Sequence, residues 1–428
     1  MNHFELRDGE LFCEDTPLSR IAESVGTPVY VYSSATLERH FQVLRSAFVE
    51  AGLKGEDGGP PLIAYAVKAN PNLAVLATLA RMGAGADTVS EGEIRRALAA
   101  GIPPGRIVFS GAGKREEEIR FALETGISEI NVESEPELRL IARVALSLGR
   151  PARLAVRVNP DVAAGGHAKI TTGGAGNKFG VSFSEAERLY AEAAADPWLQ
   201  PVGLTCHIGS QISSLAPLEA AFRRMRELVE RLRARGLPVL MLDLGGGLGV
   251  PYFNQPDPPS PADYAAMVAR VTDGLGVGLA FEPGRVIAAN AGVLLAQVLH
   301  IHERPEGRRF VVLDAAMNDL IRPAMYDAYH DIRPVRPRQG PSVIADVVGP
   351  VCETGDTFTR DRELPPLESG DLVAFMSAGA YGASMSSEYN SRLMAPEVLV
   401  RGRDWAIVRP RPTYEEMLAR EARPPWLD

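Results

Sequence analysis

The chain has 428 residues, with 45 Lys and Arg against 54 Asp and Glu, and so carries a formal net charge of -9. This negative balance argues against nucleic acid or an anionic membrane surface as the main partner. Apolar residues make up 46% and charged residues 23%, which is an ordinary globular composition. The length allows two domains, or one large barrel plus a smaller unit. No apolar run approaches the roughly 20 residues that a membrane-spanning helix needs.

The three cysteines, Cys13, Cys206 and Cys352, are widely spaced and form no Cys-x-x-Cys motif. That spacing indicates no disulfide framework, and it fits a reducing compartment. The first five residues lack the basic-then-apolar pattern of a secretory signal. We therefore expect a cytoplasmic protein, and we predict no metal site.

In chain order, residues 1–34 carry short apolar pieces separated by turn signals. Residues 21–26 are typical of a short helix that ends at a glycine. Ser33 or Ser34 is a suitable N-cap for a helix over 36–51. The glycine-rich, charged stretch 52–61 predicts a loop.

From residue 62 onward, strand patterns alternate with helix patterns. The predicted strands cover 62–67, 85–89, 106–110, 129–132, 153–158, 202–208, 239–244 and 278–282. The helical patterns between them cover 91–100, 116–125, 135–148, 184–194, 217–235 and 261–275. This alternation predicts a parallel sheet, and about eight units in roughly 220 residues match a (β/α)8 TIM-type barrel. A doubly wound α/β sheet is the alternative, but it explains less well why polar residues recur at the strand ends.

The first of these strands ends in a lysine. The apolar run from Leu62 is typical of a buried parallel strand, and Pro71 cannot lie within a central strand. Lys68 therefore follows the carboxyl end of a strand, where α/β folds place their chemistry. A lysine on apolar walls can lose its proton and act as an amine nucleophile. Taken alone, the pattern is explained better by a surface lysine whose stem packs on the protein.

Polar residues follow the other predicted strands too, and in a barrel they would converge on one mouth. In chain order they are Lys68, Asp87, Ser110, Glu133, Arg157 with Asn159, His207 with Ser210, Gly245-Gly246-Gly247, and Glu282 with Arg285. The glycines follow the seventh strand, where barrels frequently bind phosphate through backbone N–H groups. A carboxylate at Glu282 could keep a pyridine nitrogen protonated and so strengthen the ring as an electron sink. A lysine, a phosphate loop and a ring-nitrogen acid together favour pyridoxal 5'-phosphate as the cofactor.

Several motifs carry a resemblance to a known family. Tyr65-Ala-Val-Lys68-Ala-Asn70, Cys206-His207-Ile-Gly-Ser210-Gln211, Gly245-Gly-Gly-Leu-Gly249 and Glu282-Pro-Gly-Arg285 resemble the fold-type III pyridoxal-phosphate decarboxylases. Arg322-Pro-Ala-Met-Tyr326, Val351-Cys352-Glu353-Thr-Gly-Asp356 and Ala380-Tyr381-Gly-Ala-Ser-Met385 are similar to the diaminopimelate decarboxylase family in particular. The resemblance covers essentially the full chain, and the order and spacing of the motifs agree.

The resemblance implies a set of cofactor-binding residues. They are Lys68, Asp87, Arg157, His207, Ser210, Gly246, Gly247, Glu282, Gly284, Arg285 and Tyr381. Lys68 would hold the cofactor through its amine, His207 would stack on the ring, and Glu282 would pair with the ring nitrogen. Ser210 and the glycines would bind the phosphate together with the backbone of 282–285. If no cofactor were bound, the simplest interpretation of His207 would be a buried core histidine.

The resemblance also implies a substrate-binding set, namely Arg285, Arg322, Tyr326, Glu353 and Tyr381. The two arginines and Tyr326 would hold the distal carboxylate of diaminopimelate, and Glu353 would hold its distal ammonium. Lys68, His207 and Cys352 would be catalytic, with Cys352 protonating the carbon that has lost carbon dioxide. In this family Cys352 and Glu353 come from the other subunit, so a homodimer with shared active sites is implied. Arginine suits a carboxylate because its planar fork matches the two oxygens.

Beyond Arg285 the pattern changes to strands with few helices. The predicted strands cover 292–300, 309–313, 342–348, 372–375 and 397–400, with a short helical turn over 326–332 and a surface helix over 413–422. We therefore expect a cofactor-binding barrel over 36–284. A β-rich domain from 1–35 plus 285–428 would complete the active site and form the dimer interface. The Gly/Thr-rich stretch within 160–180 is long for a loop, so either a mobile lid or an ordinary insertion is expected there.

Three functions remain open at this point. The main one is decarboxylation of meso-2,6-diaminopimelate to L-lysine, the last step of lysine biosynthesis through diaminopimelate. The second is decarboxylation of another diamino or carboxy-polyamine substrate on the same fold. The third is a non-catalytic cofactor-binding barrel, which would need neither Cys352 nor Glu353.

Overall fold

The computed structural model describes residues 2–162, 178–252 and 257–427. The chain divides into two compact units. The barrel unit comprises Glu38–Pro251 and Pro256–Ile287, and the β unit comprises Met1–Leu37, Tyr252–Gln255 and Ala288–Asp428. Most of the stretch expected to form a lid, residues 163–177, lies outside the described residues.

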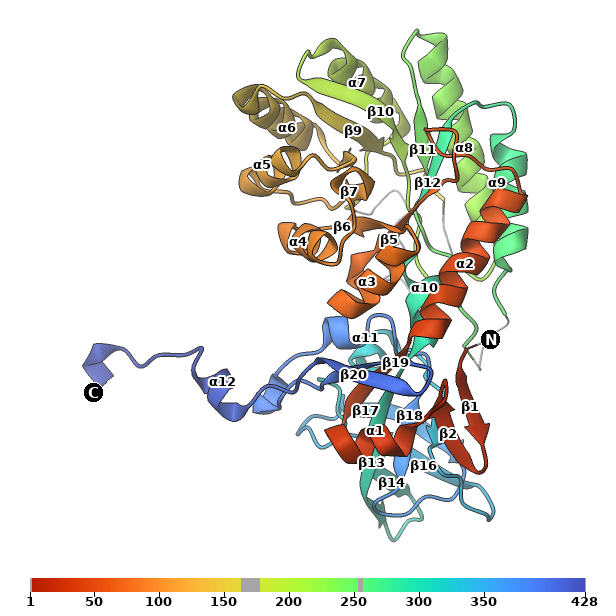
Figure 1. The fold of residues 1–428 in the computed structure, drawn as a ribbon, viewed down its shortest axis with the longest axis vertical. Helices are drawn as coiled ribbons and strands as arrows, with labels where there is room; N and C mark the ends of the chain where they lie inside the picture. Colours follow the sequence, from red (N-terminus) through yellow and green to blue (C-terminus); the bar gives the residue numbers. More distant parts are fainter. Residues whose placement is uncertain (1, 163–177, 253–256, 428) are drawn as a thin grey trace. The chain divides into compact units, whose positions relative to one another are not determined.

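The barrel unit is built on a closed barrel of eight parallel strands (Figure 1). They are β5 (Leu62–Ala66), β6 (Gly85–Thr88), β7 (Ile107–Phe109), β8 (Glu129–Val132), β9 (Ala152–Arg157), β10 (Leu199–Thr205), β11 (Met241–Asp243) and β12 (Gly278–Phe281). Each strand pairs with the next along the chain, and β12 closes the ladder onto β5 through Ala280–Leu62 and Phe281–Ile63. The predicted (β/α)8 barrel is therefore confirmed, because a doubly wound sheet would leave two open edges.

Helices cover the outside of this barrel (Figure 1). They are α2 (Ser34–Glu50), α3 (Leu73–Arg81), α4 (Glu91–Ala99), α5 (Glu116–Thr125), α6 (Glu135–Leu148), α7 (Phe183–Ala195), α8 (Leu215–Ala234) and α9 (Pro261–Thr272). Several begin where the sequence supplies a side-chain cap: Ser90, Ser134, Ser182, Ser214 and Ser260 each accept a hydrogen bond from a first-turn N–H. Because these caps fix the start of each helix, they also fix the length of the loop that leaves the preceding strand.

The β unit contains two sheets and several short helices. One sheet has β1 (Phe4–Arg7), β2 (Glu10–Cys13) and β3 (Thr16–Pro17); the other has β4 (Val29–Ser33), β13 (Gly292–Glu303), β14 (Arg309–Leu313), β15 (Ile332–Pro334), β16 (Val343–Val348), β17 (Thr357–Leu364), β18 (Leu372–Phe375), β19 (Glu397–Arg401) and β20 (Asp404–Arg409). The helices within this unit are α1 (Leu18–Val25), α11 (Arg322–Tyr326) and α12 (Tyr414–Leu418). Helix α10 (Arg285–Ala288) crosses the boundary, and all but its last residue belongs to the barrel unit. A buried cluster from α1, β4, β13, β18 and β19 forms the core of this unit.

Two predictions in the β unit need correction. The helical turn expected over 326–332 is instead α11, which ends at Tyr326 because Asp327 adopts a left-handed φ of 51°. The residues that follow include β15, which pairs with β18. The helix expected over 413–422 is only the five residues of α12, which begins at a capping box between Thr413 and Glu416. Strands β17 and β20 were not predicted, because their charged sequences lack a clear apolar pattern.

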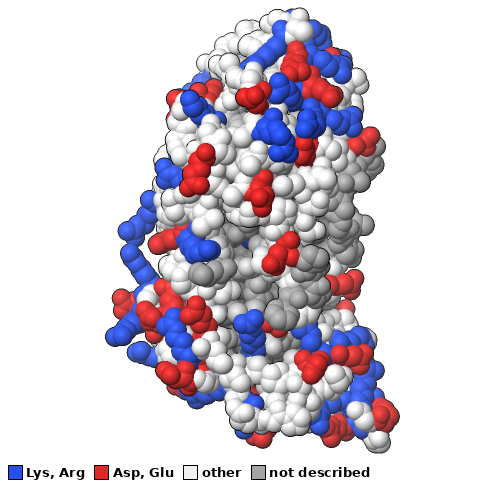
Figure 2. Space-filling view, turned by 90° about the vertical axis from the view of Figure 1, so that its right-hand side faces the viewer, with Lys and Arg blue, Asp and Glu red and all other residues white. Residues whose placement is uncertain are grey.

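Charged side chains of both signs are interspersed on the face drawn in Figure 2. On α8 they form i,i+4 pairs such as Glu219–Arg223 and Arg226–Glu230. Such exposed pairs contribute about 0.3–0.5 kcal/mol each. Among the described residues, no helix combines the length and apolar character that crossing a bilayer requires.

Candidate active site

Lys68 lies directly after the first barrel strand. Strand β5 ends at Ala66, and a single 3-10 turn over Val67–Ala69 carries the lysine. Its Nζ lies 3.0 Å from Oδ2 of Asp87, at the end of the neighbouring strand β6. The Asp87 side chain is completely buried, whereas 41% of the Lys68 side chain is exposed. The amine is therefore held in place by a buried carboxylate while it stays accessible to a ligand.

Glu282 follows the last barrel strand, and its carboxylate accepts hydrogen bonds from one side chain on β8 and one directly after β7. Its Oε1 accepts hydrogen bonds from Nδ2 of Asn131 at 3.3 Å and from Oγ of Ser110 at 3.4 Å. Asn131 and Ser110 are also hydrogen-bonded to each other, at 3.0 Å. Burial is the main cause that raises the pKa of Glu282 well above its ordinary value, and the positive charge of Lys68 opposes that shift. Strands β12 and β5 are paired neighbours in the closed parallel barrel, so Glu282 and Lys68 follow the carboxyl ends of adjacent strands.

His207 follows β10 and is held by the glycine loop. Its Nδ1 accepts a hydrogen bond from the backbone N–H of Gly246 at 3.2 Å. Burial, followed by the positive charges of Lys68 and Arg157, lowers the pKa of His207 well below 6.5. The ring is therefore neutral at physiological pH. A neutral, half-buried imidazole is suited to stacking on an aromatic ring.

The glycine loop after β11 is packed so closely that side chains do not fit. A Cβ on Gly245 would lie 2.3 Å from the carbonyl oxygen of Cys206, and one on Gly246 would lie 2.3 Å from that of Glu282. Gly247 also has a φ of +113°, which residues with side chains rarely adopt. Steric contacts therefore require glycine in this loop, in which the N–H groups of Gly245 and Gly246 already donate to Asp243 and His207.

Ser210 and Arg285 flank this loop. The guanidinium of Arg285 donates to Oγ of Ser210 from Nη2 at 3.0 Å and from Nε at 3.2 Å. Gly284 lies directly before Arg285, and its carbonyl accepts the first hydrogen bond of the turn that α10 continues. A hydroxyl and a guanidinium are suitable donors for a phosphate ester.

Arg157, at the end of β9, is engaged by another protein group. Its Nη1 lies 2.7 Å from Oε1 of Glu133, and its guanidinium lies 5.0 Å from the ring centroid of Phe179. Glu133 in turn accepts from the backbone N–H groups of Gly111 and Gly180. The structure therefore shows Arg157 holding two strand-end loops together through Glu133.

The remaining predicted site residues lie in the β unit. Arg322, on α11, is buried and donates from Nη1 to Oη of Tyr252 at 3.1 Å and to Nε2 of His330 at 3.0 Å. Tyr326 lies one turn further along the same helix and is half-buried. This guanidinium is therefore fixed in orientation by an aromatic hydroxyl and an imidazole.

Cys352 and Glu353 occupy the turn between β16 and β17, and both are exposed. Asp356 organises this turn, because its carboxylate accepts from the backbone N–H groups of Val351 at 2.7 Å and Met317 at 2.6 Å. Tyr381 is half-buried and adopts a left-handed φ of 57°. An energetically unfavourable backbone of this kind is often retained for function.

Sequence reasoning missed two residues around Glu282. Asn131 donates to it from β8, and Asp243, the last residue of β11, is a fully buried acid beside it. A signal for the first was available. In Glu129-Ile130-Asn131-Val132 polar and apolar residues alternate, which places both polar side chains on one face of the strand.

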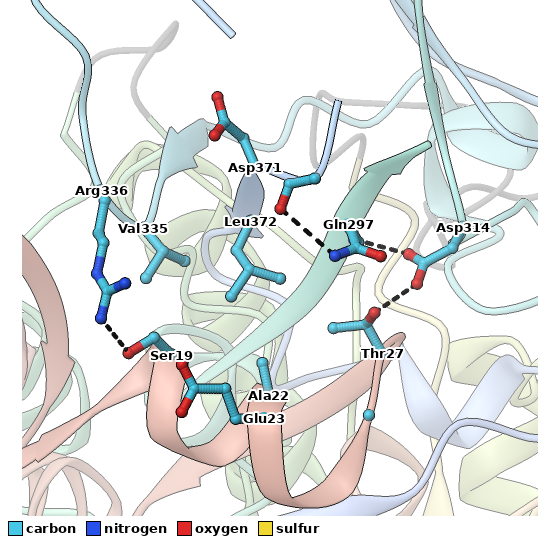
Figure 3. Close-up of a pocket in the computed structure, with 12 residues that line it drawn as sticks. Ser19, Ala22, Glu23, Thr27, Gln297, Asp314, Val335, Arg336, Asp371 and Leu372 are labelled. Carbon is cyan, nitrogen blue, oxygen red and sulfur yellow. Dashed lines mark hydrogen bonds between the residues drawn. The ribbon is translucent and has the colours of Figure 1, made fainter. Parts of the chain in front are cut away.

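The β unit also contains a cavity of about 570 Å³, shown in Figure 3. Two of its carboxylates are already hydrogen-bonded: Asp314 accepts from Oγ1 of Thr27 at 2.5 Å and from the backbone N–H of Gln297 at 2.8 Å, and Asp371 is paired with Arg338 at 2.8 Å. None of the described residues that line it was predicted to bind cofactor or substrate. The residues expected to bind cofactor and substrate therefore lie elsewhere than around this cavity.

A barrel with a lysine after its first strand, a buried acid after its last strand and a glycine loop is typical of a class of pyridoxal-dependent enzymes. Residues 36–289 match the family described as pyridoxal-dependent decarboxylase, pyridoxal binding domain. The chain is 51% identical to the diaminopimelate decarboxylase of Zymomonas mobilis and 49% identical to that of Pseudomonas aeruginosa, over 99% of both chains in each case. The structure of diaminopimelate decarboxylase from M. jannaschii in complex with L-lysine has a TM-score of 0.93 at 37% identity, over 100% of both chains. The chain belongs to the diaminopimelate decarboxylase family.

Proposed function

We propose that the protein removes the carboxylate from the D-centre of meso-2,6-diaminopimelate and releases L-lysine and carbon dioxide, as the last step of lysine biosynthesis through diaminopimelate. One observation carries this proposal above the others: the accessible amine of Lys68 and the buried acid Glu282 lie at one barrel mouth. They do so in a chain about half identical, along its whole length, to diaminopimelate decarboxylases. L-Lysine, the bound molecule in the M. jannaschii structure, is the expected product.

The residues of the barrel mouth fit pyridoxal 5'-phosphate. Lys68 would hold it through its amine, the neutral His207 would stack on its ring, and Glu282 would accept the N–H of its ring nitrogen. Ser210, Gly246, Gly247, Gly284 and Arg285 would surround its phosphate, and Asp87, Arg157 and Tyr381 would complete the binding site. When bound, this cofactor supplies an electron sink for the electron pair left as the carboxylate departs.

Residues of the β unit would provide the charged groups that bind the distal carboxylate and the distal ammonium of diaminopimelate. Arg322, whose orientation is fixed by Tyr252 and His330, would bind the distal carboxylate together with Arg285 and Tyr326. Glu353 would bind the distal ammonium. A substrate that lacks this second end would leave those charges unpaired, and such a pocket rejects it by large factors.

We assign to Cys352 the role of the acid that donates the last proton needed to form L-lysine. We propose a homodimer in which each active site takes Cys352 and Glu353 from the second copy of the chain. Residues 36–284 would then bind the cofactor, while 1–35 plus 285–428 complete the site and form the interface. The exposure of both side chains in a single chain supports this division of roles. A cytoplasmic location and the absence of nucleic-acid, membrane or metal partners remain predictions.

Carbon dioxide release tests the proposal. The protein is incubated with pyridoxal phosphate and, in separate reactions, with meso-diaminopimelate, its LL isomer, L-lysine, L-ornithine and L-arginine. Release from the meso isomer alone is the expected result. Comparable release from ornithine or lysine would favour the second candidate, a diamine-forming decarboxylase. No release from any of them, with the cofactor still trapped by borohydride, would make the protein a non-catalytic binder.

A further inference from the structure

His330 lies in the β unit between helix α11 and strand β15, and it is buried. Its carbonyl oxygen accepts a hydrogen bond from Nη2 of Arg362 at 3.3 Å. The carbonyl of the next residue, Asp331, accepts from the backbone N–H of Met376 at 2.8 Å, and the residues that follow pair as β15 with β18. The imidazole of His330 is therefore carried by a backbone that the sheet fixes in place.

Both ring nitrogens of His330 lie against groups whose hydrogen-bonding role is known. Nε2 lies 3.0 Å from Nη1 of Arg322, and Nδ1 lies 2.9 Å from the carbonyl oxygen of Met376. A guanidinium offers only N–H donors, and a carbonyl oxygen only accepts. Nε2 must therefore accept from Arg322, and Nδ1 must carry the hydrogen that is donated to Met376. Together these two contacts select the neutral Nδ1–H tautomer of the ring.

The same geometry disfavours the two other forms of the ring. The Nε2–H tautomer would point a hydrogen at an N–H of Arg322 and turn a lone pair toward the carbonyl of Met376. The doubly protonated ring would place a second positive charge against the guanidinium, whose Nη1 lies 3.0 Å away, inside the protein. His330 thus serves Arg322 as an acceptor, and only while Nε2 carries no proton.

The contact with His330 restricts how the guanidinium of Arg322 can turn. Nη1 has two hydrogens, and it donates to Oη of Tyr252 at 3.1 Å as well as to Nε2 of His330. The guanidinium carbon also lies 5.5 Å from the ring centroid of Tyr252. An arginine held in this way can bind a carboxylate without first losing the freedom of its long side chain, and binding is stronger for that reason.

We propose that His330 is a positioning residue which, as the neutral Nδ1–H tautomer, accepts from Arg322 and holds the guanidinium in the orientation that binds a carboxylate of the ligand. The ligand part rests on the proposed function, since it takes Arg322 as the group that binds the distal carboxylate. The tautomer is independent of that function, because it follows from contacts within the folded chain. His330 would accordingly increase the affinity for ligands with a carboxylate at this end and leave the affinity for other ligands unchanged.

The tautomer is tested by NMR of the full-length, cofactor-loaded protein labelled with 15N at histidine. We expect one of the 7 histidines to be a neutral Nδ1–H ring at neutral pH whose signal is missing in His330→Gln. His302→Gln, at an exposed position on β13, is the matched control and should retain that signal. The proposal is overturned if the missing signal is that of an Nε2–H or doubly protonated ring. It is also overturned if no histidine of the wild type is the Nδ1–H tautomer, a result that needs no variant to fold.

A pair of variants separates the two contacts of the ring. His330→Gln has an amide oxygen about as far along the side chain as Nε2, so it can still accept from Arg322. His330→Asn is one methylene shorter, so its amide can replace the donor to Met376 but does not reach Arg322. Both variants remove the aromatic ring, so a role in packing alone would affect them equally.

Affinities for L-lysine and for cadaverine, the diamine that lacks the carboxylate of lysine, are then measured by calorimetry. Loss of a hydrogen bond to a charged group corresponds to about ten- to a hundredfold in affinity. We expect His330→Asn to bind L-lysine more weakly by that factor and His330→Gln to bind it like the wild type, while cadaverine binds equally to all three proteins.

Equal loss of lysine affinity in both variants, or equal weakening of lysine and cadaverine, would assign His330 to packing and overturn the proposal. Unchanged lysine affinity in His330→Asn would overturn it as well. A wild type that binds no L-lysine, although the tautomer is found, would overturn the ligand part together with the proposed function. The contact between His330 and Arg322 would then stand, so the two failures are distinguishable.

Discussion

The Nζ of Lys68 lies 3.0 Å from Oδ2 of Asp87, whose side chain is completely buried. This contact fixes the end of a long flexible side chain at the barrel mouth. A residue that must present its amine to a ligand in one geometry gains from being held before the ligand arrives. Asp87 therefore holds the amine of Lys68 in one position, and the burial of this carboxylate limits the screening of its charge by solvent.

Lys68→Ala should abolish both cofactor attachment and turnover, because the amine of Lys68 is accessible, whereas Lys114, in the loop after β7, is buried and bonded to Glu137 and the carbonyl of Asn131. We expect a loss of at least about a thousandfold in kcat, as is found when a covalent catalytic group is removed. Borohydride reduction followed by mass spectrometry measures attachment, and carbon dioxide release measures turnover. Lys54→Ala, at an exposed loop position, should behave as wild type in both assays. Full activity in Lys68→Ala would contradict the assignment of this residue.

Gly246→Ala should damage the protein through the clash of one added methyl group. The new Cβ would lie 2.3 Å from the carbonyl oxygen of Glu282, so either the loop or the acid must move. We expect a loss of about 1–3 kcal/mol in the free energy of unfolding, together with weaker cofactor binding. Gly105→Ala is the matched control, because no atom lies within 4 Å of its added Cβ. Urea unfolding and cofactor titration of both variants check this; equal stability of the two would show that the loop adapts.

The barrel was predictable from sequence because the pattern of a short apolar strand followed by a helix is local and is repeated about eight times. Each strand is a short apolar run, and the residue types at its end are visible without knowledge of pairing, as for Lys68. The contacts of Glu282 were not predictable. Asn131 and Asp243 reach it from strands more than 35 residues away in the chain, and only closure of the barrel determines which polar groups face each other. The fixed orientation of Arg322 likewise depends on Tyr252 and His330, neither of which belongs to a recognisable motif.

The three cysteines should differ sharply in reactivity. Cys13 and Cys206 are completely buried, and burial raises the pKa of both thiols, whereas Cys352 is exposed. We expect one thiol per native chain to react rapidly with a disulfide reagent, and Cys352→Ala to remove that phase. L-Lysine should slow the labelling of Cys352 if this residue lies at an active site. Labelling unaffected by saturating lysine would argue against its role as proton donor.

Shared active sites predict complementation between two inactive variants. Lys68→Ala and Cys352→Ala chains are mixed, dissociated in mild denaturant and reassociated. Random pairing makes half of the dimers mixed, and each mixed dimer has one site with both residues intact. We therefore expect about a quarter of wild-type activity from the mixture. Two Lys68→Ala preparations mixed in the same way are the control, and a mixture no more active than its components would exclude sites shared in this manner.

Glu129 provides a test of stability against pH. Its side chain is buried in the barrel, and neither oxygen accepts a hydrogen bond from a described donor. Burial raises its pKa from 4.5 to about 8. Between those values the folded chain holds a proton that the unfolded chain has released, so this group's contribution to stability is fully present below about pH 4.5 and is lost as pH rises toward 8. Over this range, the contribution of Glu129 to the free energy of unfolding falls by on the order of 1 kcal/mol per pH unit.

Glu129→Gln should remove that slope, because the amide is neutral in both states. The free energy of unfolding, measured by urea at several pH values between about 5 and 8, should fall less steeply with pH in the variant than in the wild type. The two proteins should therefore differ most at the alkaline end, with the variant the more stable. Glu117→Gln, at an exposed position on α5, should leave the wild-type slope unchanged. Parallel curves for wild type and Glu129→Gln would show that this carboxyl is ionised in the folded chain, and that a counter-charge reaches it inside the barrel.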